Sequence, residues 1–310
     1  MLESYPENSK PVLVVGSVAF DNIKTPTAET GTILGGSATY GSIASSYFSA
    51  TQLVGVVGND FGEEYIDRFR SHSIDLTGLQ IDNSGKTFFW AGVYGENFET
   101  RETLETQLNV FENFDPVLPS SYLETPYVML GNIHPQLLHR VLDQMTSRSF
   151  IAADTMNLWI DISRDALLSL LPRLDLFVLN DDEAVMLTEE QNLILAGEKL
   201  LMMGPQSVLI KKGSHGALLF HPDGYFTFPA YPVTNLQDPT GAGDSFLGAF
   251  MGYLASIDKS DFADLKKAVV YGTVTASITV EAFSCDSLEK TSRQTIETRF
   301  QELLTYVSLT

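Results

Sequence analysis

Short apolar segments that alternate with segments of helical periodicity are the feature that most constrains the fold of this chain. The apolar segments, each bounded by turn residues, are Val12–Val15, Leu53–Val57, Tyr127–Leu130, Phe150–Ala153, Leu176–Leu179 and Val208–Ile210. The helical patterns are Ser37–Ser49, Phe61–Ser71, Pro135–Met145, Ala166–Leu171, and Glu183 with Leu193–Met203. Strands joined through helices imply right-handed crossovers. We therefore expect an α/β fold with a doubly wound, mostly parallel sheet flanked by helices, and ligands at the carboxyl ends of its strands.

One segment departs from this alternation. Residues 86–111 are rich in Phe, Trp, Tyr and Thr without a helical period, which predicts a small separate β-sheet. Together with residues 20–33 we interpret it as a lid over the main sheet. The chain has no internal repeat or linker-like stretch, so we expect residues 1–310 to form a single domain. The last part of the chain is helical again, over Ser245–Ser256, Asp261–Phe283 and Leu288–Val307.

The charge of the chain limits the class of partner. Lys and Arg number 19 against 39 Asp and Glu, a formal net charge of -20, which repels nucleic acid and anionic membrane surfaces. A phosphate site must therefore be built locally from backbone N–H groups, a few lysines and metal ions. The single cysteine, Cys285, excludes an internal disulfide and suits a reducing compartment. With neither a leader nor an apolar run of membrane-spanning length, we expect a cytoplasmic protein.

The strongest chemical signal is the segment Asp-Pro-Thr-Gly-Ala-Gly-Asp at residues 238–244, which leads directly into an apolar helix of small residues. Gly241, Ala242 and Gly243 leave their N–H groups unshielded at a helix N-terminus, where the helix dipole also favours an anion. Asp244 in the first turn can accept the proton of an attacking hydroxyl group. A bare glycine turn capped by aspartate would explain a shorter motif, but seven residues followed by this helix favour phosphoryl transfer.

This segment resembles the carboxy-terminal signature of the ribokinase-like (PfkB-type) family of carbohydrate and nucleoside kinases. The resemblance covers nearly the whole chain, since further matches are Val14–Asp21, Gly35–Ala38, Gly55–Gly62, Asn180–Glu183 and Lys211–Gly216. It implies a ribokinase-like fold with a β-sheet lid and an ATP-dependent, Mg²⁺-dependent kinase. The acceptor it implies is an alcohol group of a small-molecule sugar or nucleoside.

The resemblance assigns the substrate to Asp21, Gly35 and Gly36, and Asn132 is a further candidate because it follows the strand that ends at Leu130. Asp21 closes an apolar strand, where paired sugar hydroxyls would satisfy a buried carboxylate, although capping of the next turn explains it too. Gly35 and Gly36 allow a ligand to approach the backbone, or simply begin a helix. Asn132 follows a strand, where asparagine also stabilises turns.

The resemblance assigns ATP to Asn180, Lys211, Gly213 and Gly216. It also implies that Asn180 and Glu183 hold Mg²⁺ through water, which suits a pair of oxygen ligands. A helix cap at Asn180 with an acidic first turn explains the same two residues. Lys211 is the cation best placed to reach phosphate, and a solvated lysine after a strand is the alternative.

Three positions depart from the family pattern. Tyr40 stands where the family usually has an asparagine after the Gly-Gly turn, and Lys211 stands where threonine is frequent. Many members bind a monovalent cation such as K⁺ near the anion hole. Asp238, Thr240 and Ser284 are the candidate ligands here, although the glycine often found near Ser284 is missing.

Two other nucleotide motifs fail on spacing. Ser84–Thr87 resembles the end of a P-loop, but Gln80 occupies the position of the first glycine and a strand pattern follows. The first strand lacks the three-glycine spacing of a nicotinamide-dependent dehydrogenase. The five histidines show no metal-ligand spacing.

The remaining alternative to a kinase is a non-catalytic protein on the same fold that senses a sugar or a nucleotide.

The identity of the acceptor stays open between a sugar and a nucleoside. The aromatic residues that could stack on a nucleobase, or simply pack the lid and the core, are Phe20, Tyr40, Phe88, Phe89, Trp90 and Trp159. Exposed apolar faces on the lid also suggest a homodimer.

Overall fold

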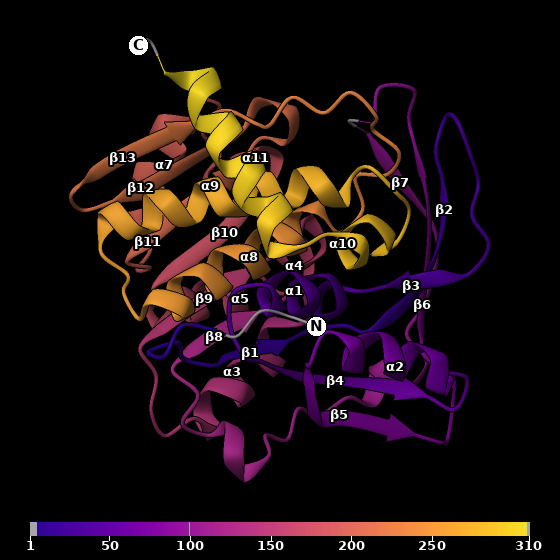
Figure 1. The fold of residues 1–310 in the computed structure, drawn as a ribbon. Helices are drawn as coiled ribbons and strands as arrows, with labels where there is room; N and C mark the ends of the chain where they lie inside the picture. The colour runs from indigo at the N-terminus through magenta and orange to yellow at the C-terminus, as the bar shows by residue number, and fades with distance from the viewer. Residues whose placement is uncertain (1–4, 99, 309–310) are drawn as a thin grey trace.

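The strands of the protein form one large and one small sheet in the computed structural model, which describes residues 5–98 and 100–308 (Figure 1). The large sheet has nine strands in the order β13-β12-β11-β10-β9-β8-β1-β4-β5. In that order they are Gly224–Phe228, Ala217–His221, Ser207–Lys211, Leu176–Asn180, Phe150–Asp154, Tyr127–Leu130, Val12–Val15, Thr51–Gly58 and Asp75–Asp82. All neighbouring pairs are parallel except β11–β12 and β12–β13, so β12 alone runs in the opposite direction, which confirms the mostly parallel sheet.

Helices cover both faces of the large sheet, as alternation along the strands requires. In β1, Val12 and Val14 belong to one buried cluster and Leu13 and Val15 to the other. The helices on the first face are α1 (Ser37–Ser46), α2 (Glu63–Ser71), α8 (Ala242–Ile257), α9 (Phe262–Thr279), α10 (Asp286–Lys290) and α11 (Arg293–Val307). Those on the second face are α3 (Pro135–Gln144), α4 (Asn157–Ile162), α5 (Arg164–Leu170), α6 (Asp181–Thr188) and α7 (Leu193–Met202). The doubly covered α/β fold is therefore confirmed.

The second sheet, called the lid sheet below, contains four strands in the order β3-β2-β6-β7 and stands beside the large sheet (Figure 1). Its strands are β3 (Ile33–Gly35), β2 (Ala19–Lys24), β6 (Phe88–Tyr94) and β7 (Arg101–Gln107). Both of the segments expected to form a lid contribute strands. This confirms a small separate sheet built from two distant parts of the chain.

Several elements differ from the sequence expectation. Strand β5 was not predicted from the sequence. It lies at the edge of the large sheet with one partner strand, and its polar residues interrupt the apolar run by which a buried strand is recognised. Strands β12 and β13 form a short antiparallel hairpin around Pro222 and Asp223. The helix expected over Leu288–Val307 is divided into α10 and α11, because the Ser292 hydroxyl accepts a hydrogen bond from Thr295 N and begins a new helix.

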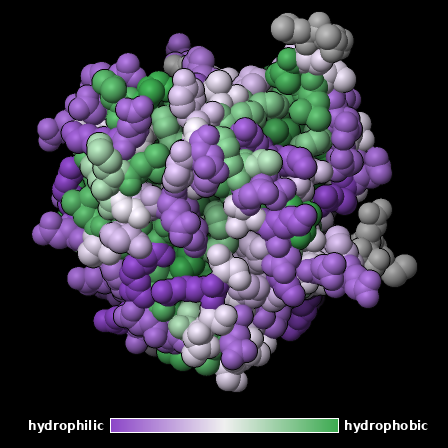
Figure 2. Space-filling model, turned by 90° about the vertical axis from the view of Figure 1, so that its left-hand side faces the viewer, coloured by the Kyte–Doolittle hydropathy of each residue, from purple (hydrophilic) through white to green (hydrophobic). Residues whose placement is uncertain are grey.

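Figure 2 shows the face near the edge strands β12 and β13, where hydrophobic residues form separate patches among hydrophilic ones. Exposed apolar side chains such as Met202 and Tyr225 are ordinary on the surface of a folded domain. In the part of the chain that the structure describes, no helix combines the length and the apolar character needed to cross a membrane.

Helix α8, which begins at the signature segment, lies unusually close to α1. A Cβ atom at Gly248 would overlap the backbone carbonyl oxygen of Gly41, and one at Gly252 would lie 2.8 Å from Ser45 O. Both contacts are with backbone atoms, which cannot rotate away as a flexible side chain can. The two helices therefore fix each other's position through glycine.

We predict that Gly248→Val destabilises the protein by about 1 to 3 kcal/mol, the range for overpacking. The added side chain must separate α8 from α1, and thermal unfolding measures the effect. Gly31→Ala is the control, because a Cβ at Gly31 meets no atom within 4 Å. Equal melting temperatures for Gly248→Val and the wild type would contradict the close approach.

Candidate active site

The signature segment forms a left-handed turn at the N-terminus of α8. Gly241 has φ 76°, and Ala242, Gly243 and Asp244 form the first turn of this 16-residue helix. A Cβ at Gly241 would overlap the ring of Tyr40, so the turn requires glycine. Ala242 N donates to Pro239 O at 3.2 Å and is thus already engaged within the turn. The turn offers an anion the positive end of a long helix.

Two carboxyl groups meet near this turn. Burial raises the pKa of Asp244 to about 7, with a further rise from Asp154 and opposition from Lys211 and Arg101. Burial also raises the pKa of Asp21 to about 8, and the charges of Asp238 and Asp244 add to the shift. Asp21 and Asp244, which are far apart in the sequence, therefore lie close enough to influence each other. A carboxylate with a pKa near neutrality is well matched to general-base chemistry.

Three of the residues expected to bind the acceptor lie close together where β2 and β3 of the lid sheet meet the start of α1. Asp21 lies on β2 and is 4% exposed. A Cβ at Gly35, in the neighbouring strand β3, would overlap the Asp21 carboxylate, so glycine leaves room for the acid. Gly36 has φ 97° and begins α1. The Gly-Gly turn is thus required to make room for the Asp21 carboxylate, whether or not a ligand also approaches its backbone.

The side chains of Asn132 and Tyr40 are already engaged within the protein, which limits their availability to a substrate. The Asn132 side-chain oxygen accepts a hydrogen bond of 2.7 Å from Trp159 Nε1. Tyr40 is 1% exposed, and its hydroxyl group has no hydrogen-bond partner among the described residues. The tyrosine supports the turn at Gly241 from below and does not present a polar group to the surface.

Three polar residues lie at the carboxyl ends of neighbouring parallel strands: Asp154 on β9, Asn180 on β10 and Lys211 on β11. Lys211 Nζ donates to Asp154 Oδ2 at 2.6 Å. Asp154 was missed from the sequence, although an acidic residue directly after an apolar run was a usable signal. This edge of the sheet therefore combines a cation with oxygen ligands.

Asn180 and Glu183 form the capping box of α6. Glu183 N donates to Asn180 Oδ1 and Asn180 N donates to Glu183 Oε2, each at 2.8 Å. Burial, with the charge of Asp154, raises the pKa of Glu183 to about 7. The helix cap, which the sequence analysis gave as the alternative to a Mg²⁺ site, is therefore present. It uses Glu183 Oε2 and leaves Glu183 Oε1 outside the capping box.

The loop after Lys211 contains the two glycines expected near the nucleotide. Gly213 and Gly216 have φ 51° and 83° and flank a short 3₁₀ turn between β11 and β12. A Cβ at Gly213 would meet no atom within 4 Å, whereas one at Gly216 would overlap Phe228 O. Gly213 is therefore the open position in this loop.

The lid sheet touches the turn directly. The Tyr94 hydroxyl on β6 shares a hydrogen bond of 2.9 Å with Thr240 Oγ1. Arg101 is paired with Tyr94 across β6 and β7. Its positive charge offsets part of the rise that burial causes in the pKa values of Asp21, Glu183 and Asp244. Sequence reasoning missed Arg101, because only strand register brings it to the site.

Asp238, Thr240 and Ser284 surround the base of the turn. Asp238 Oδ1 accepts from Thr240 N at 2.9 Å, while Oδ2 is buried without a hydrogen-bond partner among the described residues. Burial raises the pKa of Asp238 to about 6. The Ser284 hydroxyl donates to Leu34 O at 2.6 Å, and Ser284 has φ 56°, a conformation that favours glycine. The orphaned Asp238 oxygen fits a cation.

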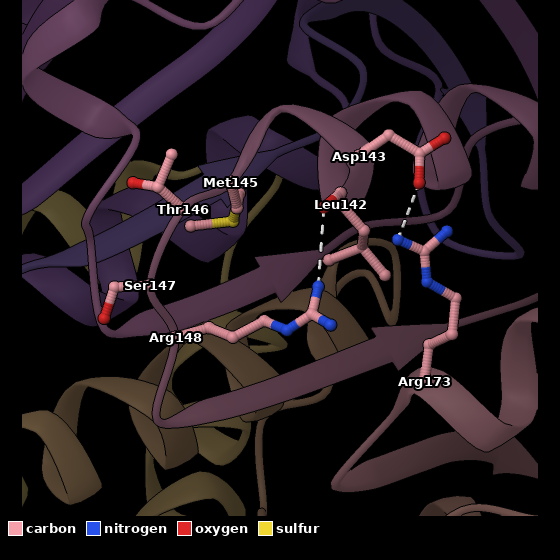
Figure 3. Close-up of a pocket in the computed structure, with 7 residues that line it drawn as sticks. All are labelled: Leu142, Asp143, Met145, Thr146, Ser147, Arg148 and Arg173. Carbon is pink, nitrogen blue, oxygen red and sulfur yellow. Dashed lines mark hydrogen bonds and ion pairs between the residues drawn. The ribbon is translucent and has the colours of Figure 1, made fainter.

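Within residues 5–98 and 100–308, no group of three or more His, Cys, Asp or Glu side chains is arranged to hold a metal ion. A pocket of about 560 Å³ is lined by residues that precede β9 and β10 (Figure 3). It therefore lies at the amino ends of these strands, whereas the candidate site lies at their carboxyl ends. Its lining includes the ion pair of Arg173 with Asp143. It contains none of the residues described above.

Comparison with known proteins identifies the family and the fold. The model of the pfkB family carbohydrate kinases matches residues 12–291. A cytidine kinase of Thermococcus kodakarensis is 29% identical over 253 residues, which are 78% of this chain and 88% of that protein. The nucleoside kinase structure of Methanocaldococcus jannaschii has a TM-score of 0.77 at 18% identity, covering 95% and 99% of the two chains. A putative ribokinase II of E. coli with ATP and Mg²⁺ has a TM-score of 0.78 at 20% identity, covering 94% and 99%.

The raised pKa values predict the pH dependence of stability. Carboxyl groups with pKa values of about 7 to 8 hold protons in the folded state that the unfolded chain releases above about pH 4. Their contribution to stability is therefore fully present below about pH 4, decreases as the pH rises, and is completely lost once the pH exceeds about 8. We expect a higher melting temperature at pH 6 than at pH 8. Asp21→Asn should flatten this dependence, because an amide does not titrate.

The control for this measurement is Asp143→Asn, the same change at an exposed carboxylate. It should retain the wild-type slope of melting temperature against pH. An unchanged slope in Asp21→Asn would show that the buried acid of β2 is ionised in the folded protein throughout this range.

Proposed function

Because this chain belongs to the PfkB carbohydrate kinase family, we propose that it transfers the γ-phosphate of ATP to an alcohol group of a sugar or nucleoside, with Asp244 as the general base. The observation that carries the proposal is the position of Asp244. It lies in the first turn of α8, beside an anion-binding helix end and a second acid, with a pKa raised to about 7. A base of this pKa is ionised in much of the protein near neutral pH.

In the proposed reaction, Asp21 orients the acceptor hydroxyl toward Asp244. Asp244 takes the hydroxyl proton, the oxygen forms a bond to the γ-phosphorus, and the bond from that phosphorus to the β–γ bridging oxygen breaks to release ADP. Gly241, Ala242 and Gly243 supply the positive helix end that stabilises charge on the transferred group. The lid sheet, with residues 20–33 and 86–111, excludes water from the reacting atoms.

On the nucleotide side, we assign ATP to Asn180, Lys211, Gly213 and Gly216. Asn180 and Glu183 would hold Mg²⁺ through water, since the capping box leaves one Glu183 oxygen outside it. When bound, Mg²⁺ supplies positive charge to the phosphate oxygens. Asp238, Thr240 and Ser284 form the candidate K⁺ site, supported by the buried Asp238 oxygen without a partner.

Trp90 favours a nucleoside over a free sugar as the acceptor. It lies opposite Asp21 in the register of β2 and β6, so both side chains share one face of the lid sheet. Its ring extends over Gly92, where a Cβ would overlap it, and its Nε1 donates to Thr103 Oγ1 at 3.2 Å. The Arg101 guanidinium carbon lies 5.4 Å from the centroid of this half-buried ring, and displacement of that side chain by a base would give a stacking surface next to the acid that we assign to the ribose. The similarity to a cytidine kinase supports this choice.

The proposal extends to the organisation of the protein. A reducing, cytoplasmic location and a single domain of residues 1–310 stay predictions, as does a homodimer through the lid. All seven residues of β7 are exposed, but Leu104 is the one large apolar side chain among them. This strand does not supply the apolar face on which the prediction of a homodimer rests.

We predict that Asp244→Asn lowers turnover by about 10² to 10⁴, the range for loss of a general base, with little change in ATP affinity. Coupled measurement of ADP release tests turnover, and calorimetry tests nucleotide binding. The acceptor panel is ribose, fructose, adenosine, inosine, guanosine and cytidine. Tight ligand binding by the wild type without turnover on any of the six would favour a sensor.

We predict that Trp90→Ala raises KM for the preferred nucleoside by about 10- to 100-fold, as expected from about 1 to 3 kcal/mol of base stacking. KM for free ribose is the internal control and should change less than about two-fold, because ribose has no base to stack. Equal losses for the two acceptors would show that Trp90 acts on the lid sheet and not on the base.

A further inference from the structure

Asp154 and Lys211 form an ion pair that the family resemblance does not predict. They end β9 and β11, the two neighbours of β10, and Lys211 Nζ lies 2.6 Å from Asp154 Oδ2. The lysine side chain is 18% exposed and the aspartate side chain 7%. No other ion pair of the described residues buries both partners to this degree.

The lysine also lies against the anion-binding turn. A Cβ at Gly243 would be 2.8 Å from Lys211 Nζ, so the missing side chain of this glycine is what admits the ammonium group. The charge therefore stands beside the residues that we assign to the transferred phosphoryl group. Lys211 comes from the large sheet and Gly243 from α8, so neither element alone creates this contact.

The acidic groups around Lys211 keep it charged. Burial lowers the pKa of Lys211, but the charge and hydrogen bond of Asp154, with the charges of Glu183 and Asp244, outweigh burial and raise the pKa overall. Stability is a weak explanation for such a pair, since apolar side chains of similar volume fill a buried space at no greater cost. A positioned cation at an anion site is the stronger explanation.

We propose that Asp154 is a positioning residue, which holds the Lys211 ammonium group beside Gly243 so that the cation meets the transferring phosphoryl group in a single orientation. The proposal rests on the kinase function proposed above. A free lysine side chain samples many rotamers, and Asp154 restricts it to one before ATP arrives. Asp154 thus acts on the phosphoryl group through Lys211, and its separate effect on the pKa of Asp244 is distinguished by the pH at which kcat is measured.

A double-mutant cycle in the full chain tests this arrangement. The variants are Asp154→Asn, Lys211→Met and the double variant, and each is assayed for kcat and for KM of ATP and of the acceptor. If Lys211→Met does not fold, Lys211→Gln takes its place in both arms. Thermal unfolding and binding of a non-hydrolysable ATP analogue report the folded fraction, so that kcat refers to folded protein.

We expect Lys211→Met to lower kcat by about 10²- to 10³-fold, the loss seen for one donor to a transition-state oxyanion. Asp154→Asn should lower kcat by about 10- to 100-fold, the usual effect of removing a supporting partner, without changing KM for the acceptor. At a pH well above 7, where Asp244 is ionised in every variant, the double variant should have the kcat of Lys211→Met within about two-fold, because the direct effect of Asp154 on the pKa of Asp244 is then no longer felt. A purely structural pair would lower the melting temperature and leave kcat of the folded fraction intact.

The matched control is Asp143→Asn, which removes the acidic partner of Arg173 at the opposite edge of the sheet (Figure 3). It should retain wild-type kcat. Multiplied losses in the double variant, or a kcat within two-fold of wild type for Asp154→Asn, would overturn the positioning role. A wild-type protein that phosphorylates none of the six acceptors would instead overturn the kinase proposal itself.

Discussion

The close contact of α1 with α8 determines where the chemistry can take place. Gly248 and Gly252 allow the backbones of the two helices to approach, and Tyr40 of α1 fills the space beneath Gly241. The N-terminus of α8 is thereby held against the carboxyl ends of the parallel strands. Because a parallel sheet gathers its strand ends at one edge, residues from β9, β10 and β11 then face the same turn.

A small part of the acidic charge of the chain is gathered in a buried group of carboxyl side chains around the site. Asp21, Asp154, Glu183 and Asp238 are all less than a tenth exposed. Burial raises the pKa values of Asp21, Glu183 and Asp238. Lys211 and Arg101 are the cations whose charges act on this group. A site so rich in carboxylates binds a polyphosphate only with help from metal ions and helix dipoles. The composition alone required such local compensation.

Local sequence signals predicted most of the central strands, the signature turn and the small separate sheet. Each of these depends on neighbours in the sequence: an apolar run, a pair of glycines, or a cluster of aromatic residues. Strand β5 was missed because an edge strand has polar residues on its open side. The helical break at Ser292 was missed because an N-cap serine does not interrupt an otherwise continuous pattern.

The partnerships within the site could not be predicted in this way, because they join residues far apart in the sequence. Lys211 meets Asp154 only because β10 spaces their strands, and Trp159 meets Asn132 across a loop. Arg101 enters the site through its register with Tyr94. The sequence left Tyr40 open between stacking on a base and packing the core, and its burial beneath Gly241 shows that it packs against the turn.

The hydrogen bond between Tyr94 and Thr240 has a consequence for the order of events in a catalytic cycle. It ties a strand of the lid sheet to the segment that would receive the phosphoryl group, so the two cannot separate without losing it. Movement of the lid sheet away from the large sheet would therefore also remove a contact that holds Thr240 in the signature turn. In a kinase, a phosphate-binding turn that depends on such a contact would take its full shape only with the lid sheet in place, which favours transfer to a bound acceptor over transfer to water.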